Sequence, residues 1–279
     1  MKHLFFVLGL VLAGCAPKVI TQTTGLATPT SPTAGFLVIK ETDTFTGPAE
    51  ELGDIQVKDS GLSLICDYET AVALATQRAR QLGANVLRIY EHRQPGMMST
   101  CHQIGAKALR VPDLTPYETE IVWSATRPLR QVDFKANTTS RPFEALTSSG
   151  IRYHYAGRPF QRTVQLTVET VFDCQNSYFK GTRNPAYTLA HEQGHFDITE
   201  LYARRFAQRL QEQAPTLREL QAKQEALHHQ IMTEGRVLQD QYDSDVYADP
   251  GKQPAWLARI AQELAASQPY ASKQVTIRL

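Results

Sequence analysis

Short apolar runs, some of them alternating with polar residues, fill the first half of the chain. They predict four strands, at residues 36–39, 55–57, 86–90 and 106–111. Between the second and third strands, Asp67 precedes apolar residues at helical spacing that stop at Gly83, as at a capped helix. A helix packed on a small sheet indicates a compact α+β domain over residues 35–112.

The second half of the chain alternates first and then becomes helical. The alternation predicts strands at 120–124, 151–155 and 163–172, which form a twisted antiparallel sheet. One long helix follows Asn184-Pro185, a second opens with the capping box Thr216-Leu217-Arg218-Glu219, and a short third helix carries Trp256. Residues 116–279 therefore form a second domain, and the fold class of the chain is α+β.

The N-terminal fifteen residues have the layout of a secretory signal. Lys2 gives the positive start, residues 4–11 the apolar run, which is too short to span a bilayer, and Leu12-Ala13-Gly14-Cys15 the end. These last four residues resemble the bacterial lipobox, which implies that residues 1–14 are removed and that Cys15 carries lipid. Ala16 in place of Asp implies the outer membrane, facing the periplasm or the exterior. An ordinary cleaved signal or a buried N-terminal helix is the alternative.

Charge and composition limit the partners. Lys and Arg number 29 against 28 Asp and Glu, so no basic nucleic-acid surface is predicted. We expect partners within the cell envelope, and a membrane reached through the lipid. Residues 17–32 are rich in Thr, Pro and Gly, which predicts a flexible tether over 15–34. Their three prolines disfavour the alternative, an edge strand.

Four cysteines need assignment in an oxidising compartment. With Cys15 lipidated, Cys66 and Cys101 are the natural disulfide, because both belong to the first domain. Cys174 is then predicted to be a buried small apolar residue at a strand end.

The helix after Asn184 contains His191-Glu192-Gln193-Gly194-His195, an H-E-x-x-H motif. Two imidazoles four residues apart project from one helix face, the spacing that a tetrahedral Zn²⁺ needs from two nitrogen ligands. Glu192 lies off that face, where it can act as general base on a metal-bound water. The motif indicates hydrolysis of a peptide or another acyl bond. Two solvated histidines on a surface helix are the alternative.

Longer strings around the motif resemble the DUF922 family of predicted secreted bacterial zinc proteases. They are T-S-S-G-I at 147–151, F-D-C-Q-N-S at 172–177 and L-A-H-E-Q-G-H-F-D-I at 189–198. The likeness covers residues 116–260 and implies a zincin-like fold in which His191 and His195 hold zinc and Glu192 is the base. In the first domain, residues 66–70, 82–85 and 99–102 resemble small Rcs-sensor-type envelope lipoproteins, which implies a spacer or interaction module.

The third zinc ligand is where the chain departs from that family. Members carry a histidine after the second helix, and the matching position here is Ala248. A carboxylate can replace imidazole on zinc, and Asp249 is ranked first, ahead of Asp245 and Asp243. His228 and His229 are expected to be exposed or packed.

Two further acids follow the motif on the same helix. Asp197 and Glu200 are candidates to orient the ligands, with surface charges or a pair with Arg204 as the equal alternative. Two functions stay open for the chain: a membrane-anchored zinc peptidase, and an envelope lipoprotein that keeps the fold with impaired catalysis in a binding or structural role.

Overall fold

The computed structural model describes the chain except for residues 1–16, 32–34, 61–66, 97–98, 100 and 158–161. The described chain divides into two compact units, Met1–Tyr117 and Glu118–Leu279. The fold is mixed α+β, with antiparallel sheets and, among the described residues, four α-helices. None of these helices is both long and apolar enough to cross a membrane.

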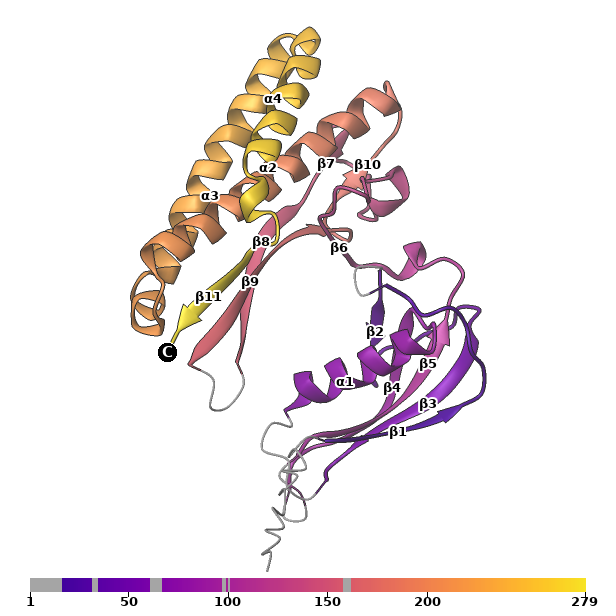
Figure 1. The fold of residues 1–279 in the computed structure, drawn as a ribbon. Coiled ribbons are helices and arrows are strands. Elements are labelled where there is room, and N and C mark those ends of the chain that lie inside the picture. Colours follow the sequence, from indigo (N-terminus) through magenta and orange to yellow (C-terminus); the bar gives the residue numbers. More distant parts are fainter. Residues whose placement is uncertain (1–16, 32–34, 61–66, 97–98, 100, 158–161) are drawn as a thin grey trace, which may run out of the picture. The chain divides into compact units, whose positions relative to one another are not determined.

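Unit 1 is a five-stranded sheet with one helix on it (Figure 1). The strands are β1 (Lys18–Thr23), β2 (Leu37–Ile39), β3 (Glu50–Lys58), β4 (Val86–Arg93) and β5 (Gln103–Arg110). The order is β1-β3-β5-β4-β2, antiparallel except for the parallel pair β4 and β2. Helix α1 (Tyr68–Gln81) presents Ala71, Ala75 and Ala79, all fully buried, and these small side chains let the helix lie close to the sheet.

The predicted ends of α1 are confirmed. The Asp67 carboxylate accepts a hydrogen bond from the Thr70 backbone N–H at 2.7 Å. Gly83 follows the helix with φ +89°, a conformation that favours glycine. A Cβ on Gly83 would also lie 2.7 Å from the Cβ of Ala27.

The predicted tether is wrong in its first part. Residues 18–23 form β1, an edge strand paired with β3, and the backbone N–H groups of Ala27 and Thr30 donate to Leu82 and Arg80. Pro17 directly precedes β1 and Pro29 lies after its end, so neither proline interrupts the pairing. Cys15 and Cys66 lie outside the described residues, so the lipid and the Cys66–Cys101 disulfide stay predictions.

Unit 2 combines a sheet with three packed helices (Figure 1). Strand β9 (Thr163–Asp173) pairs antiparallel with β6 (Glu120–Val122), β8 (Ser149–Gly157) and β11 (Gln274–Arg278). A separate pair joins β7 (Ala145–Leu146) to β10 (Tyr178–Phe179). The helices are α2 (Pro185–Gln213), α3 (Leu217–Ala248) and α4 (Gln253–Ala266), with short 3₁₀ turns at Gln131–Asp133, Pro250–Lys252 and Gln268–Tyr270; a further 3₁₀ turn, Thr115–Tyr117, ends unit 1.

The main core of unit 2 lies between the sheet and α2. Leu166 and Val168 of β9 meet Ile198 and Phe206 of α2, and α3 and α4 add their own apolar stripes. Four residues predicted to share one side of α3 are all buried: Leu220, Leu227, Ile231 and Leu238. The capping box at Thr216 and Glu219 is present, and Cys174 is a fully buried free thiol, as predicted.

Candidate metal centre

The H-E-x-x-H motif lies in the second and third turns of α2. Asn184 caps the helix, and its side chain accepts from the Tyr187 backbone N–H at 3.4 Å. Its φ of +37° lies in the left-handed region, which Asn tolerates better than most residues. His191 and Glu192 are 5% and 4% exposed, so the surface-helix alternative does not describe them.

Three donor atoms converge between α2 and α3. Asp243 Oδ1 lies 3.0 Å from the Nε2 atom of His191 and 3.0 Å from that of His195. The two Nε2 atoms are 3.1 Å apart. Among the described residues, this is the one group of three potential ligands whose donor atoms lie mutually within 4.8 Å. Two imidazoles and a carboxylate are a nitrogen and oxygen set that suits Zn²⁺.

Charge holds this triangle together. Burial opposes ionisation of Asp243, yet hydrogen bonds from His191 and His195 lower the pKa of its carboxyl strongly. Burial also disfavours the charged form of His195, but the hydrogen bond to Asp243 and its negative charge raise the pKa of His195 overall. A carboxylate that stays ionised beside two imidazoles is ready to bind a cation.

Gln239 of α3 fixes the orientation of His195. Its side-chain oxygen accepts from His195 Nδ1, and its amide nitrogen donates to the His195 backbone carbonyl at 2.9 Å. Because Nδ1 keeps the proton that it donates to Gln239, loss of the other ring proton leaves the lone pair of His195 on Nε2, the atom beside His191 and Asp243. Gln239 thus orients His195, the role that we predicted for Asp197 and Glu200.

Gly194 allows α3 to approach the motif. A Cβ at Gly194 would lie 2.7 Å from the Tyr242 hydroxyl oxygen, so only glycine leaves room for that ring. Tyr242 is fully buried and stacks on the His191 imidazole, with ring centroids 4.7 Å apart and an interplanar angle of 22°. This contact places the next residue, Asp243, opposite the two histidines.

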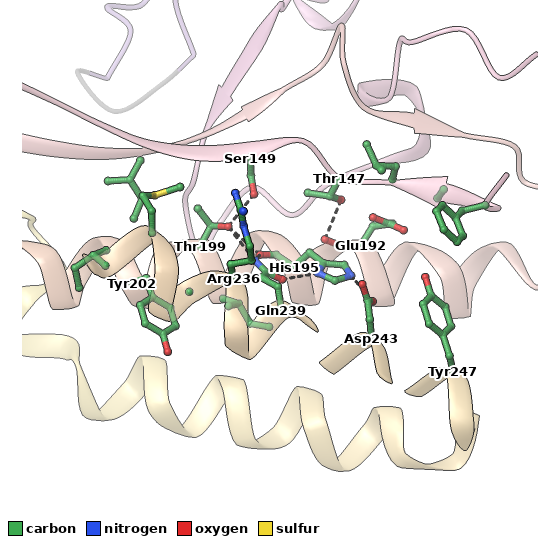
Figure 2. A pocket seen from close by; sticks show the side chains of 18 residues that line it. Thr147, Ser149, Glu192, His195, Thr199, Tyr202, Arg236, Gln239, Asp243 and Tyr247 are labelled. Carbon is green, nitrogen blue, oxygen red and sulfur yellow. Dashed lines mark hydrogen bonds and ion pairs between the residues drawn. The ribbon is translucent and has the colours of Figure 1, made fainter. Parts of the chain in front are cut away.

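Glu192 is buried without full satisfaction of its carboxylate. Its Oε2 atom is buried and has no hydrogen-bond partner among the described residues, and the same holds for His191 Nδ1. Burial raises the pKa of Glu192, although the nearby histidines partly oppose this. The Thr147 hydroxyl donates to the Glu192 backbone carbonyl at 3.2 Å, which ties this turn of α2 to the strand side (Figure 2).

Two cavities adjoin the triangle. The larger, about 360 Å³, lies between α2, α3 and the strands β7 and β8; Glu192, His195 and Asp243 line it (Figure 2). The smaller, about 200 Å³, is lined by His191 and Glu192. Phe143, Ala145, Glu192 and Tyr247 line both, so open space lies on either side of the acid.

Asp249, the carboxylate ranked first as third ligand, is not in the cluster. It caps the turn after α3, where its Oδ1 accepts from the Gly251 backbone N–H at 2.9 Å. Asp245 binds Lys252 at 3.2 Å and the Trp256 ring N–H at 3.2 Å. Helix α3 continues to Ala248, so the residue that faces α2 is Asp243, inside the helix rather than after it.

Asp197 and Glu200, the two acids predicted to orient the ligands, form hydrogen bonds with other residues. The Asp197 carboxylate accepts from the Trp123 ring N–H at 2.7 Å and from the Gln193 amide at 2.8 Å. Glu200 is fully buried and bonds Arg204 at 2.8 Å, which agrees with the alternative offered for it. In the part of the chain that the structure describes, neither acid forms a hydrogen bond or an ion pair with His191 or His195.

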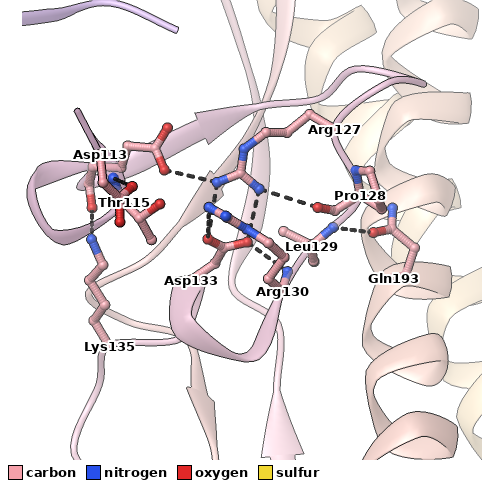
Figure 3. A network of polar contacts seen from close by, with 10 residues as sticks. Asp113, Thr115, Arg127, Pro128, Leu129, Arg130, Asp133, Lys135 and Gln193 are labelled. Atoms are coloured by element: carbon pink, nitrogen blue, oxygen red, sulfur yellow. Dashed lines mark hydrogen bonds and ion pairs between the residues drawn. The ribbon is translucent and has the colours of Figure 1, made fainter. Parts of the chain in front are cut away.

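Gln193 connects the motif to a loop of unit 2 (Figure 3). Its side-chain oxygen accepts from the Leu129 backbone N–H at 2.7 Å. The same loop is held by Asp133, which is 1% exposed and bonds Arg127 at 2.9 Å. Burial opposes ionisation of Asp133, but Arg127 and the Arg130 backbone N–H keep its pKa below the usual range. Gln193 thus ties the middle of the motif to a loop that is itself held by a buried ion pair.

Tyr247 and Gln239 are site residues that sequence reasoning missed. Both lie at four-residue steps from Asp243 on α3, the spacing of one helix face. Tyr247 is 62% exposed, but its partial burial and the negative charge of Asp243 together raise its pKa to about 12, so its hydroxyl remains a donor at neutral pH. His228 packs against Phe206 and approaches the Ile151 carbonyl at 3.3 Å, while His229 is exposed, as predicted.

Comparisons with protein families, with curated proteins and with solved structures found no match to this chain. The resemblance to zinc proteases therefore rests on the sequence motifs alone, and the geometry of the site carries the functional argument.

Proposed function

We propose that unit 2 is a zinc-dependent hydrolase that cleaves peptide bonds in the manner of zincins. The observation that carries the proposal is the juxtaposition of three converging donors with a buried carboxylate oxygen, Glu192 Oε2, that has no hydrogen-bond partner among the described residues. Protein interiors rarely leave such a group unpaired without a reason. His191, His195 and Asp243 would hold the ion, as three protein ligands with an open fourth position are typical of catalytic zinc.

The side chains divide the work of hydrolysis. A bound Zn²⁺ would supply Lewis acidity and a water of lowered pKa. Glu192, whose pKa is raised by burial, would act as the general base that accepts a proton from the attacking water and would return it to the leaving amine. Tyr247 lines both cavities and stays protonated, which makes it the candidate to donate to the developing negative charge on the carbonyl oxygen.

The strand side of the cavity offers a place for an extended substrate. Ala145 and Leu146 of β7 line the larger cavity, and β10 is the one strand paired with β7 among the described residues. A peptide added along the other edge of β7 would lie between that strand and α2, with its backbone hydrogen-bonded to the protein. This arrangement favours a peptide over a compact small molecule.

The lipobox-like sequence supports a place in the cell envelope for this activity. We propose that lipid on Cys15 anchors the protein, most simply at the outer membrane, and that unit 1 serves as a spacer or interaction module. Fractionation of cells that express Cys15→Ser tests the anchor: release from the membrane is expected, and unchanged membrane association would reject it.

A Glu192→Gln variant tests the hydrolase proposal. We expect it to keep bound zinc and to lose cleavage of casein or envelope peptides by about two to four orders of magnitude, the usual contribution of a general base. Glu225→Gln, exposed on α3, is the matched control and should cleave like the parent.

Equal cleavage by the Glu192→Gln and parent proteins would reject the proposed mechanism. A parent protein that binds zinc stoichiometrically yet cleaves no peptide would favour the other function, an envelope lipoprotein with a binding or structural role.

A further inference from the structure

The larger cavity has two chemically different ends. Around Glu192, His195 and Asp243 its wall is polar and carries the proposed chemistry. About two helical turns further along α2 the wall is made of large apolar side chains: Ile151, Ile198, Tyr202, Ile231 and Met232. Gly235 keeps this end open, because a Cβ there would lie 3.3 Å from the Tyr202 ring. A volume of about 360 Å³ is enough for a large apolar side chain.

Arg236 adds a positive charge to this wall. It lies on α3, lines the cavity, and in Figure 2 extends from α3 toward the strand side that carries Ser149. The Ser149 and Thr199 hydroxyls, which also line the cavity, bond each other at 2.8 Å. Within the described part of the chain, no carboxylate lies within ion-pair distance of the Arg236 guanidinium, whereas Arg204, Arg205 and Arg209 of α2 each have one.

The position of Arg236 sets a distance along the substrate. Arg236 and Asp243 are seven residues apart on α3, which is two turns or about 10 Å along the helix. An extended peptide advances about 3.3–3.6 Å per residue. A group bound by Arg236 therefore lies about three residues or fewer from a peptide bond held beside Asp243.

We propose that this cavity selects peptides that carry a large apolar side chain and, within about three residues on the same side of the cleaved bond, a free carboxylate bound by Arg236. The inference rests on the hydrolase proposal and names its substrate class. The carboxylate is a chain terminus or an acidic side chain, and a guanidinium binds either one through paired, charge-assisted hydrogen bonds. Arg236 is then a specificity residue rather than part of the bond-breaking machinery.

Three fluorescent hexapeptides test the proposal, each with a leucine beside the central bond. The first ends in a free carboxylate three residues beyond that bond, the second has an amidated end and a glutamate at that position, and the third has an amidated end and a glutamine. Binding is measured by anisotropy in the Glu192→Gln protein with added Zn²⁺, so that the peptides stay intact. We expect the first, the second or both to bind about tenfold or more tightly than the third.

Charge-matched variants separate the site from general attraction. Arg236→Gln should abolish the preference, while Arg218→Gln, exposed in the first turn of α3 and outside the cavity, should retain it. Whether the first or the second peptide wins identifies the source of the carboxylate. Equal affinity for all three peptides, binding of none, or an unchanged preference in Arg236→Gln would overturn the proposal.

Cleavage of the same peptides by the parent protein shows which proposal fails, the carboxylate subsite or the hydrolase. Cleavage without carboxylate preference would leave the hydrolase and remove the subsite. Selective binding without any cleavage would keep the carboxylate subsite and reject the hydrolase proposal.

Discussion

Helix α2 carries two buried polar clusters that differ in how completely their carboxylates are hydrogen-bonded. The Glu200 carboxylate bonds Arg204 at 2.8 Å, Lys273 at 2.9 Å and the Thr170 hydroxyl at 2.6 Å, and Arg204 also donates to the Leu264 carbonyl at 2.8 Å. Two turns earlier, Glu192 Oε2 has no hydrogen-bond partner among the described residues, and it lies on the same helix as two of the three converging donor atoms. The carboxylate of the first cluster is fully hydrogen-bonded, whereas the second cluster leaves buried polar atoms that a ligand could satisfy.

That contrast separates a structural role from a functional one. The Glu200 cluster fixes the register of α2 against β9 and residue 273. Because its charged groups are already paired with one another, they are not available to bind a ligand. An unsaturated cluster costs stability, which is tolerated where a bound ion or substrate later supplies the missing partner. If this interpretation is correct, the two clusters respond differently to the same kinds of change.

The largest expected effect is on stability. Glu200→Ala leaves Arg204 and Lys273 buried without their shared carboxylate, and should lower the free energy of unfolding by about 3–5 kcal/mol. Glu192→Gln should not lower it, because burial already disfavours the charge on Glu192. Urea unfolding of the metal-free proteins measures both. A loss for Glu192→Gln as large as that for Glu200→Ala would remove the distinction between the clusters.

A smaller effect is expected at Gln239. Gln239→Ala removes the acceptor that orients His195, and should weaken zinc binding about 10- to 100-fold while the fold persists. Gln230→Ala, exposed on the same helix, is the control and should bind zinc like the parent. Competition with a chromophoric chelator gives the affinities. Equal affinity of the two variants would show that Gln239 does not position the ligand.

Sequence alone predicted the local features of this chain well. The caps at Asp67, Asn184 and Thr216 rest on contacts within a few residues, and the structure contains all three. The burial of Cys174 was also predicted, from its place at the end of a strand and from the assignment of the other three cysteines. Strand β1 was missed because prolines near a strand were counted against it, although its edge pairing depends on β3, more than 25 residues away.

The third ligand shows why the rest of the site was harder to predict. The choice of Asp249 assumed that the loop after α3 supplies the ligand, whereas the carboxylate that lies beside the two histidines, Asp243, belongs to the helix itself. Extending the buried stripe from Leu238 to Tyr242 and Val246 would have placed Asp243 beside that stripe, on the side of Gln239. Which carboxylate reaches the histidines depends on how α3 crosses α2, and that is set by the close contact of Gly194 with Tyr242.

Zinc content is the most direct test of the central claim, that His191, His195 and Asp243 form a metal centre. Elemental analysis of the purified protein should give one zinc per chain, and Asp243→Ala should lose it while circular dichroism stays unchanged. Asp249→Ala should keep the zinc, because that carboxylate only caps a turn. A parent protein without metal after incubation with Zn²⁺, or a loss of zinc on Asp249→Ala but not on Asp243→Ala, would contradict the account.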